Sequence, residues 1–319
     1  MTIVSIITPL FNKKYYIAET IQSVLAQTLQ NWEMLVIDNL STDNSFEIAQ
    51  QFEDPRIRFL QCHKQGPGAT RNLGIQNATG EWIQFLDGDD LLEPEHLEHQ
   101  LEVAQARGNA DIIVSCWQEF TDANPNKRTL KKPQGMGKSG QDLKNSAIAY
   151  TPWASHAALV KRSILREDYL WPEELDQFLA EDTAFWFRLI NNFSVTYSEH
   201  CGVLYRTAVP ESRTSPDPQK WFEGNHQVIK NNLNYLENHD LRVTSGQMEY
   251  LIKIYTGIYH YSKIKADKLI QERCKNEINF WLSFYLKAVS FPKLSILSLK
   301  LLGLENYLNL VKLRLSFTI

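Results

Sequence analysis

The chain has 319 residues with 33 basic and 37 acidic side chains, so its formal net charge is −4. This balance excludes a broadly basic surface, and we expect no nucleic-acid partner. Hydrophobic residues make up 43% of the chain and charged residues 22%, which excludes disorder and is typical of a globular protein with a real core. The length favours two domains, or one large α/β domain with an appendage.

The cysteines and the apolar segments indicate a cytoplasmic protein. The cysteines are scattered without CxxC spacing, which favours free thiols over disulfides or a zinc site. The first apolar run contains Pro9 and follows no basic residues, so we interpret it as a strand and not as a signal peptide. No stretch reaches the ~18 uninterrupted apolar residues of a membrane-spanning helix. Peripheral contact with a membrane remains compatible with this prediction.

The first 117 residues alternate between short apolar runs and segments of helical periodicity. Strands are predicted at 3–8, 34–37, 57–62, 82–86 and 111–117. Helices are predicted between them, at 16–29, 45–52, 70–77 and 95–106. This alternation is typical of βαβ units, so we predict an α/β fold with a mostly parallel sheet covered by helices on both faces.

The pattern changes after residue 117. Residues 124–140 combine prolines and glycines with basic side chains, which predicts a mobile loop or an irregular hairpin. A structured segment resumes near Trp153 and ends near Arg206, and the chain is helical beyond 215. We therefore predict a domain at 1–214, composed of the halves 1–117 and 118–214, and a helical region at 215–319.

Carboxylates gather where two predicted strands end. Asp38 ends the second strand, and Asp87-Gly88-Asp89-Asp90 follows the fourth. Ligands of an open parallel sheet bind beyond the carboxyl ends of its strands. Strand termination and helix capping explain some of these acids, but three carboxylates within four residues repel one another unless a cation lies among them. An Asp-x-Asp here is suited to hold Mg²⁺ or Mn²⁺ against a diphosphate.

Three segments follow one another in a distinctive order: VSIITPLFN, then ETIQSVLAQTLQNWEMLVIDNLSTDNS, then GPGATRNLGIQNATGEWIQFLDGDD. Together they resemble the family 2 glycosyltransferases of the GT-A fold, closely over residues 1–120 and more loosely to about 210. The resemblance implies a Rossmann-like, nucleotide-binding sheet flanked by helices, with a C-terminal helical extension. It makes 1–117 the half that binds the nucleotide sugar and 118–214 the half that binds the acceptor.

The resemblance also implies a nucleotide pocket. Thr8, Pro9 and Phe11 would line it, although core packing is an equal alternative for Phe11. Asp38 would accept a hydrogen bond from the uracil ring. The family carries a second acid after this position, and this chain has Asn39 instead.

The resemblance assigns three charged residues to different parts of the donor. Arg71 would approach the nucleotide, and the alternative is a solvated position on its helix. Asp87 would approach the ribose. Asp89 would ligate the divalent metal, Mn²⁺ or Mg²⁺, that bridges the diphosphate, because the leaving group gains negative charge as the bond breaks.

A base for inverting transfer is expected at Glu181-Asp182. A carboxylate can take the proton of the acceptor hydroxyl if it lies within hydrogen-bond reach. Acids are also favoured at the start of a helix, so capping is the structural alternative. The family carries a Glu-Asp pair here, before an aromatic-rich helix with Arg-Leu, matched by Arg188-Leu189. By resemblance Asp182 is the base, and Glu181 positions the acceptor.

Three more residues are candidates outside the donor pocket. Trp153 could stack on a sugar, because an indole face suits the apolar side of a pyranose. His156 could face the acceptor, although a lone histidine more often has a structural role. Arg206 could assist the leaving diphosphate.

The segment 291–319 is rich in leucine at helical spacing, and four basic residues there outnumber one acidic residue. Packing on the catalytic domain is the favoured interpretation. A homodimer through the C-terminal helices and an in-plane contact with a membrane are the alternatives.

The sequence thus predicts a metal-dependent, inverting, non-processive glycosyltransferase of the hexosyl- or N-acetylhexosaminyltransferase type. It would move a sugar from a nucleotide-diphosphate donor, by preference a UDP-sugar, to a saccharide or lipid-linked saccharide in cell-surface polysaccharide synthesis. The alternative is an inactive protein of the same fold that binds sugar nucleotides or serves as an assembly subunit. Joint retention of Asp38, Asp87, Asp89 and Asp182 favours the enzyme, because an inactive copy has no need of the base.

Overall fold

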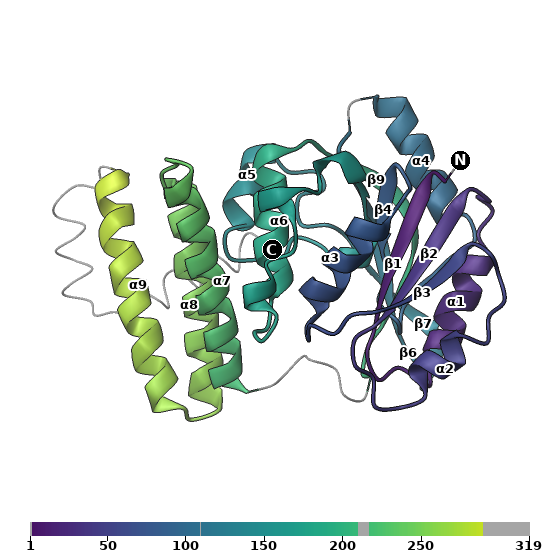
Figure 1. Ribbon diagram of the computed structural model, residues 1–319. Helices are drawn as coiled ribbons and strands as arrows, with labels where there is room; N and C mark the ends of the chain where they lie inside the picture. The colour runs from purple at the N-terminus through teal and green to yellow at the C-terminus, as the bar shows by residue number, and fades with distance from the viewer. Residues whose placement is uncertain (1, 109, 210–216, 290–319) are drawn as a thin grey trace. The chain divides into compact units, whose positions relative to one another are not determined.

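The computed structural model describes residues 2–108, 110–209 and 217–289. The chain forms two compact units, shown as a ribbon in Figure 1. The first unit comprises Met1–Leu143 and Thr151–Thr214, and the second comprises Lys144–Tyr150 and Ser215–Ile319.

One mixed sheet organises the first unit. Its strands are β1 (Val4–Leu10), β2 (Trp32–Asp38), β3 (Ile57–Gln61), β4 (Trp82–Phe85), β5 (Leu91–Leu92), β6 (Ile112–Thr121), β7 (Asn124–Lys131), β8 (Ala158–Lys161) and β9 (Val195–Arg206). They follow the order β3-β2-β1-β4-β8-β6-β9-β5, and β7 pairs with β6. The pairs β1–β2, β1–β4 and β2–β3 are parallel, which confirms the predicted βαβ organisation of the N-terminal half.

Helices cover both faces of this parallel part. They are α1 (Ile17–Leu25), α2 (Ser45–Ala49), α3 (Pro67–Asn77) and α4 (His96–Arg107). Ile6 of β1 shares an apolar cluster with residues of α1, α2 and α4. Ile7 points to the other face, where it lies so close to Gly74 of α3 that a Cβ on this glycine would be 2.5 Å from Ile7 Cγ2. Figure 1 accordingly shows α1 and α2 on one side of β1–β3 and α3 on the other.

The C-terminal half of the first unit departs from the simple alternation. Strand β8 pairs in antiparallel fashion with β4 and β6, whereas β9 is parallel to β6. Strand β7 forms a hairpin with β6, so the hairpin alternative is confirmed for the first part of 124–140, residues 124–131. This strand had no apolar alternation to reveal it, because nearly all of its residues are exposed. Helix α6 (Glu181–Asn192) follows the short 3₁₀ turns η3 (Glu167–Tyr169) and η4 (Glu173–Leu175).

Long helices make up the described part of the second unit. They are α7 (Pro218–Asn238), α8 (Ser245–Ile264) and α9 (Lys268–Ala288), and α5 (Gly140–Ser146) extends from one unit into the other. Each long helix begins at a side-chain cap, provided by Asp217, Thr244 and Asp267. The predicted C-terminal helices are therefore present. No helix among the described residues is long and apolar enough to cross a membrane. The leucine-rich segment 291–319 lies outside the described residues.

Candidate active site

Residues 87–90, which follow β4 and which we call the acidic turn, lie at the carboxyl edge of the parallel strands. The register of β1 and β2 aligns Leu10 with Asp38, so both strands end at this edge. The turn itself is closed by a hydrogen bond from Asp90 N to Asp87 O (3.0 Å). Asp38 and the acidic turn therefore lie at the same end of the parallel strands, as the strand pattern predicted.

Asp90 anchors this turn to the fold. Its carboxylate is fully buried, and it accepts a hydrogen bond from the backbone N–H of Arg206 (2.8 Å). The other carboxylate oxygen is paired with Nδ1 of His156 (2.8 Å). Burial raises the pKa of Asp90 to about 6, although His156 opposes this increase. The pKa of His156 is raised in turn. Burial of the ring would lower it, but the negative charges of Asp90 and Asp87 outweigh the burial.

Asp87 and Asp89 each face a different cation. Asp87 pairs with Nη2 of Arg71 (2.8 Å), and Asp89 pairs with Nζ of Lys13 (2.7 Å). Burial raises the pKa of Asp87, but Arg71, His156 and Lys13 outweigh it and hold the pKa below its ordinary value. The pKa of Asp89 is raised, because its burial and the charge of Asp87 outweigh Lys13.

Three of these side chains could together hold a divalent cation. Ligand atoms of Asp87, Asp90 and His156 lie within 4.8 Å of one another, the one such group found among the described residues. Carboxylate oxygens with an imidazole suit Mn²⁺ better than Mg²⁺, which takes oxygen ligands. Asp89, the predicted ligand, is not in this group because its carboxylate turns to Lys13.

Arg71 is buried and lies between two sets of acids. Its exposed fraction is 6%, so the solvated alternative is wrong. Besides Asp87, its guanidinium approaches Glu181, with 3.9 Å between Nη1 and Oε1. Nε and Nη1 have no hydrogen-bond partner among the described residues. A buried arginine with unsatisfied donors is able to receive the oxygens of a ligand.

The residues predicted to line the nucleotide pocket lie at and just beyond the end of β1. Thr8 is buried on this strand, and its hydroxyl has no hydrogen-bond partner among the described residues. Pro9 is the next residue of the same strand. Phe11 is 47% exposed, so core packing is not its role. An exposed aromatic ring just beyond a strand end is available to contact a ligand.

The hydrogen bonds of Asn39 explain why this position carries an amide instead of the family's second acid. Its amide nitrogen donates to the carbonyls of Cys62 (3.0 Å) and Lys64 (2.8 Å). Its amide oxygen accepts from the N–H of Gly66 (2.8 Å). An aspartate could make only the last of these bonds, because an ionised carboxylate has no donor. The amide therefore holds the loop that leads into α3, and Asp38 beside it is buried.

Asp182 lies in the first turn of α6, beside Glu181. It accepts a hydrogen bond from the hydroxyl of Thr151 (2.9 Å). Burial and the charge of Glu181 raise the pKa of Asp182 to about 6, against the opposing effects of Thr151 and Arg71. A carboxylate with a pKa near neutrality is suited to general-base work.

The structure corrects the predictions for Trp153 and His156. Trp153 is 2% exposed and packs edge-on against Trp186, with 5.2 Å between ring centroids, so neither face is open to a sugar. His156 is buried against Asp90, so it belongs to the acidic turn and not to an acceptor surface.

Arg206 also differs from its predicted role. Its guanidinium donates to the carbonyl of Asp89 (2.9 Å) and pairs with Glu19 (2.6 Å) and Asp122. These contacts favour a role for Arg206 in supporting the acidic turn over its predicted contact with the leaving diphosphate. The prediction missed this because Glu19 and Asp122 are distant in sequence from Arg206.

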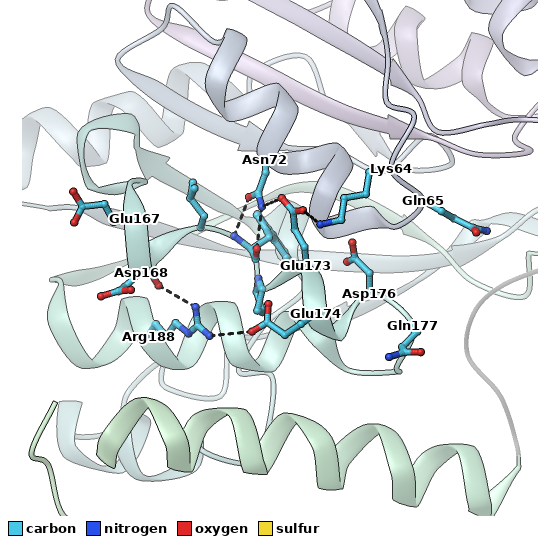
Figure 2. A pocket seen from close by; sticks show the side chains of 13 residues that line it. Lys64, Gln65, Asn72, Glu167, Asp168, Glu173, Glu174, Asp176, Gln177 and Arg188 are labelled. Carbon is cyan, nitrogen blue, oxygen red and sulfur yellow. Dashed lines mark hydrogen bonds and ion pairs between the residues drawn. The ribbon is translucent and has the colours of Figure 1, made fainter. Parts of the chain in front are cut away.

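A cavity of about 700 Å³ lies next to α3, along the segment that contains η3 and η4. Figure 2 shows Asn72, Glu173 and Lys64 of its lining directed toward one another. This segment was predicted to be structured, but no site residue was predicted in it. Trp171 lines the cavity and contacts Arg71. The pairing of Lys13 with Asp89 was also not predicted. Its position shortly after the end of β1 could have indicated it, because that position places a positive charge at the same sheet edge as the acids.

Comparisons with known proteins agree on one family. The model described as "Glycosyl transferase family 2" matches residues 5–168. The chain is 31% identical over 214 residues to an uncharacterized glycosyltransferase of Rickettsia typhi, over 67% of this chain and 66% of the relative. It is 34% identical over 149 residues to TuaG of Bacillus subtilis, a putative teichuronic acid biosynthesis glycosyltransferase, over 46% of this chain and 59% of TuaG. The chain thus matches less than two thirds of the length of either relative, 66% and 59%.

Solved structures show the same fold at low sequence identity. S. aureus TarS 1-349 in complex with UDP has a TM-score of 0.61 at 17% identity, and 91% of each chain is covered. The complex of the same fragment with UDP-GlcNAc has a TM-score of 0.56 at 16% identity, over 91% of this chain and 92% of that one.

Proposed function

The chain belongs to glycosyl transferase family 2, and from this membership we propose that it transfers a single sugar, with inversion, from a UDP-sugar to a saccharide or lipid-linked saccharide. One observation carries the proposal: Arg71 lies buried between Asp87 of the acidic turn and Glu181, the neighbour of Asp182. A donor-side carboxylate, a cation and an acceptor-side carboxylate are thus adjacent. A role in cell-surface polysaccharide synthesis is supported by the likeness to TuaG.

On the donor side, Thr8, Pro9 and Phe11 would line the nucleotide pocket and Asp38 would accept from the uracil ring. The choice of UDP is supported by the likeness to TarS, which was solved with UDP and with UDP-GlcNAc. Arg71 would donate its unsatisfied N–H groups to donor oxygens, since a buried guanidinium gains most from an anionic partner.

Asp87 would approach the ribose, and Asp89 would ligate Mn²⁺ or Mg²⁺, with the Asp90–His156 pair next to it in the same turn. When bound, the metal supplies Lewis-acid stabilisation of the departing diphosphate. Lys13 already places a positive charge on Asp89, so this carboxylate is oriented for a cation before the donor arrives.

On the acceptor side, Asp182 would remove the proton of the attacking hydroxyl. With a pKa of about 6 the carboxylate is mostly ionised at neutral pH and is still a stronger base than an ordinary aspartate. The acceptor oxygen bonds to the anomeric carbon, the bond to the diphosphate oxygen breaks with its electron pair, and the proton stays on Asp182. Glu181 would position the acceptor.

We assign this chemistry to 1–214 and treat 215–319 as a separate helical region. An inactive sugar-nucleotide binder is not favoured, because such a protein gains nothing from a buried carboxylate that is costly to ionise.

Calorimetry of UDP binding with Mn²⁺ and with EDTA tests the donor site. We expect Mn²⁺ to strengthen binding, and Asp89→Ala to remove the metal effect while the protein stays folded. Asp54→Ala is the matched control, since this carboxylate pairs with Arg56 away from the acidic turn. Equal UDP affinity of the wild type with Mn²⁺ and with EDTA would refute the metal assignment, and absence of UDP binding would refute the donor.

A further inference from the structure

Trp171 lies in the segment between η3 and η4, and its backbone is fixed to α3. Its N–H donates to the amide oxygen of Asn72 (2.9 Å), and its carbonyl accepts from the amide nitrogen of the same side chain (2.9 Å). Both residues are buried. Because Asn72 follows Arg71 in α3, these two bonds place the indole of Trp171 next to the arginine.

The indole ring contacts elements from both sides of the proposed site. The guanidinium carbon of Arg71 lies 4.4 Å from the ring centroid, within the range of a cation–π contact. Phe185 of α6 stacks on the ring with 4.0 Å between centroids and 9° between planes. Phe85 of β4 meets it edge-on at 5.3 Å. Trp171 thus touches the arginine beside Asp87 and the helix that begins with Glu181-Asp182.

Few other contacts orient the guanidinium. Among the described residues it makes one hydrogen bond to a carboxylate, from Nη2 to Asp87, and Glu181 lies beyond hydrogen-bond distance at 3.9 Å. A single bond leaves the plane of the group free to rotate about that contact. The flat indole surface removes this freedom, and in a buried site the contact is strengthened because no water competes for the cation.

We propose that Trp171 is a positioning residue for sugar transfer, whose indole ring holds the guanidinium of Arg71 between Asp87 and Glu181 and thereby sets the affinity for the donor nucleotide. This inference rests on the proposed function, since it requires that Arg71 meets the donor. Trp171 itself acts through Arg71 and not on the reacting atoms.

A double-mutant cycle with UDP and Mn²⁺ tests the proposal. The variants are Trp171→Met, Trp171→Phe, Arg71→Lys and the double variant of Trp171→Met with Arg71→Lys. Methionine fills much of the space without an aromatic face, whereas phenylalanine keeps a smaller one. We expect Trp171→Met to weaken UDP binding about 10-fold and Trp171→Phe about 3-fold. The double variant should bind no more weakly than Arg71→Lys alone.

Trp32→Met is the matched control. This tryptophan is equally buried and also carries an arginine, Arg56, at 3.8 Å from its ring, but it lies at the start of β2. We expect a loss of thermal stability similar to that of Trp171→Met, with UDP affinity within about 2-fold of wild type.

Two results would overturn the inference while the wild type still binds UDP. One is unchanged affinity in Trp171→Met, and the other is a double variant in which the two losses multiply. If Trp171→Met does not fold, the cycle is run with Trp171→Phe, and multiplied losses in that cycle would overturn the inference equally. A wild type that does not bind UDP would instead refute the proposed function, and the inference with it.

Discussion

Replacement of Asp182 by Asn should slow transfer strongly and stabilise the protein at the same time. The pKa of Asp182 is raised from 3.8 to about 6, chiefly by burial and then by Glu181. The folded state therefore holds the proton more tightly than the unfolded state. Ionising Asp182 therefore destabilises the folded state. This destabilisation is complete above about pH 6 and absent below about pH 4.

The size of this effect follows from the two pKa values. Their difference corresponds to about 3 kcal/mol at neutral pH, because one pKa unit is worth 1.36 kcal/mol. Asparagine keeps the oxygen that accepts from Thr151 and carries no charge to desolvate. Asp182→Asn should therefore raise the free energy of unfolding by up to about 3 kcal/mol at pH 7.5 and by nothing measurable at pH 4.

Activity should change in the opposite direction. General-base catalysis contributes ~10²–10⁴-fold, so transfer by Asp182→Asn should fall at least 100-fold while UDP affinity barely changes. Denaturant unfolding at both pH values measures the stability, and UDP release from a UDP-sugar with its acceptor measures the rate. Asp54→Asn is the control, because Arg56 lowers the pKa of Asp54, so this variant should lose stability and keep its rate. A near wild-type transfer rate in Asp182→Asn, or a loss of stability at pH 7.5, would refute the reasoning.

Three further perturbations test the surroundings of the site. Asn39→Asp removes two donated hydrogen bonds and should lower the free energy of unfolding by ~1–3 kcal/mol in urea titrations; an unchanged midpoint would contradict this account of Asn39. Arg206→Met removes the bond to the carbonyl of Asp89 and should weaken UDP binding in the presence of Mn²⁺ as well as stability, whereas loss of stability alone would separate Arg206 from the acidic turn. Lys13→Met removes the cation that occupies Asp89, so Mn²⁺ should bind more tightly without UDP in a calorimetric titration, and weaker binding would assign Lys13 another role.

The N-terminal half of the fold could be predicted from the sequence because its signals are local. Strands β1, β2 and β4 are buried throughout or nearly so, and helices separate them at the expected spacing. The acids at the strand ends follow from the same pattern. Burial of Arg71 does not, because a single charged residue on a short helix is expected to be solvated until the surrounding elements are known.

The rest of the site depends on contacts between residues far apart in the sequence. His156 meets Asp90 only because β8 inserts between β4 and β6 in the antiparallel direction. Trp171 reaches Arg71 through its bonds to Asn72, which is 99 positions away in the sequence, from a segment with no regular periodicity. Periodicity predicts which face of an element is buried, but it contains no information on which distant element covers that face.

The acidic turn shows how the fold resolves the repulsion that the sequence implies. Three carboxylates within four residues receive three separate cations: Arg71 from α3 for Asp87, Lys13 for Asp89 and His156 for Asp90. The fold therefore does not need a metal to hold the turn together. Because Lys13 already neutralises Asp89, a divalent ion that binds there exchanges one cation for another and gains only the difference between them. Tight metal binding then requires further ligands, and the diphosphate of a donor supplies oxygens of the right kind, so metal and nucleotide should each bind more strongly when the other is present.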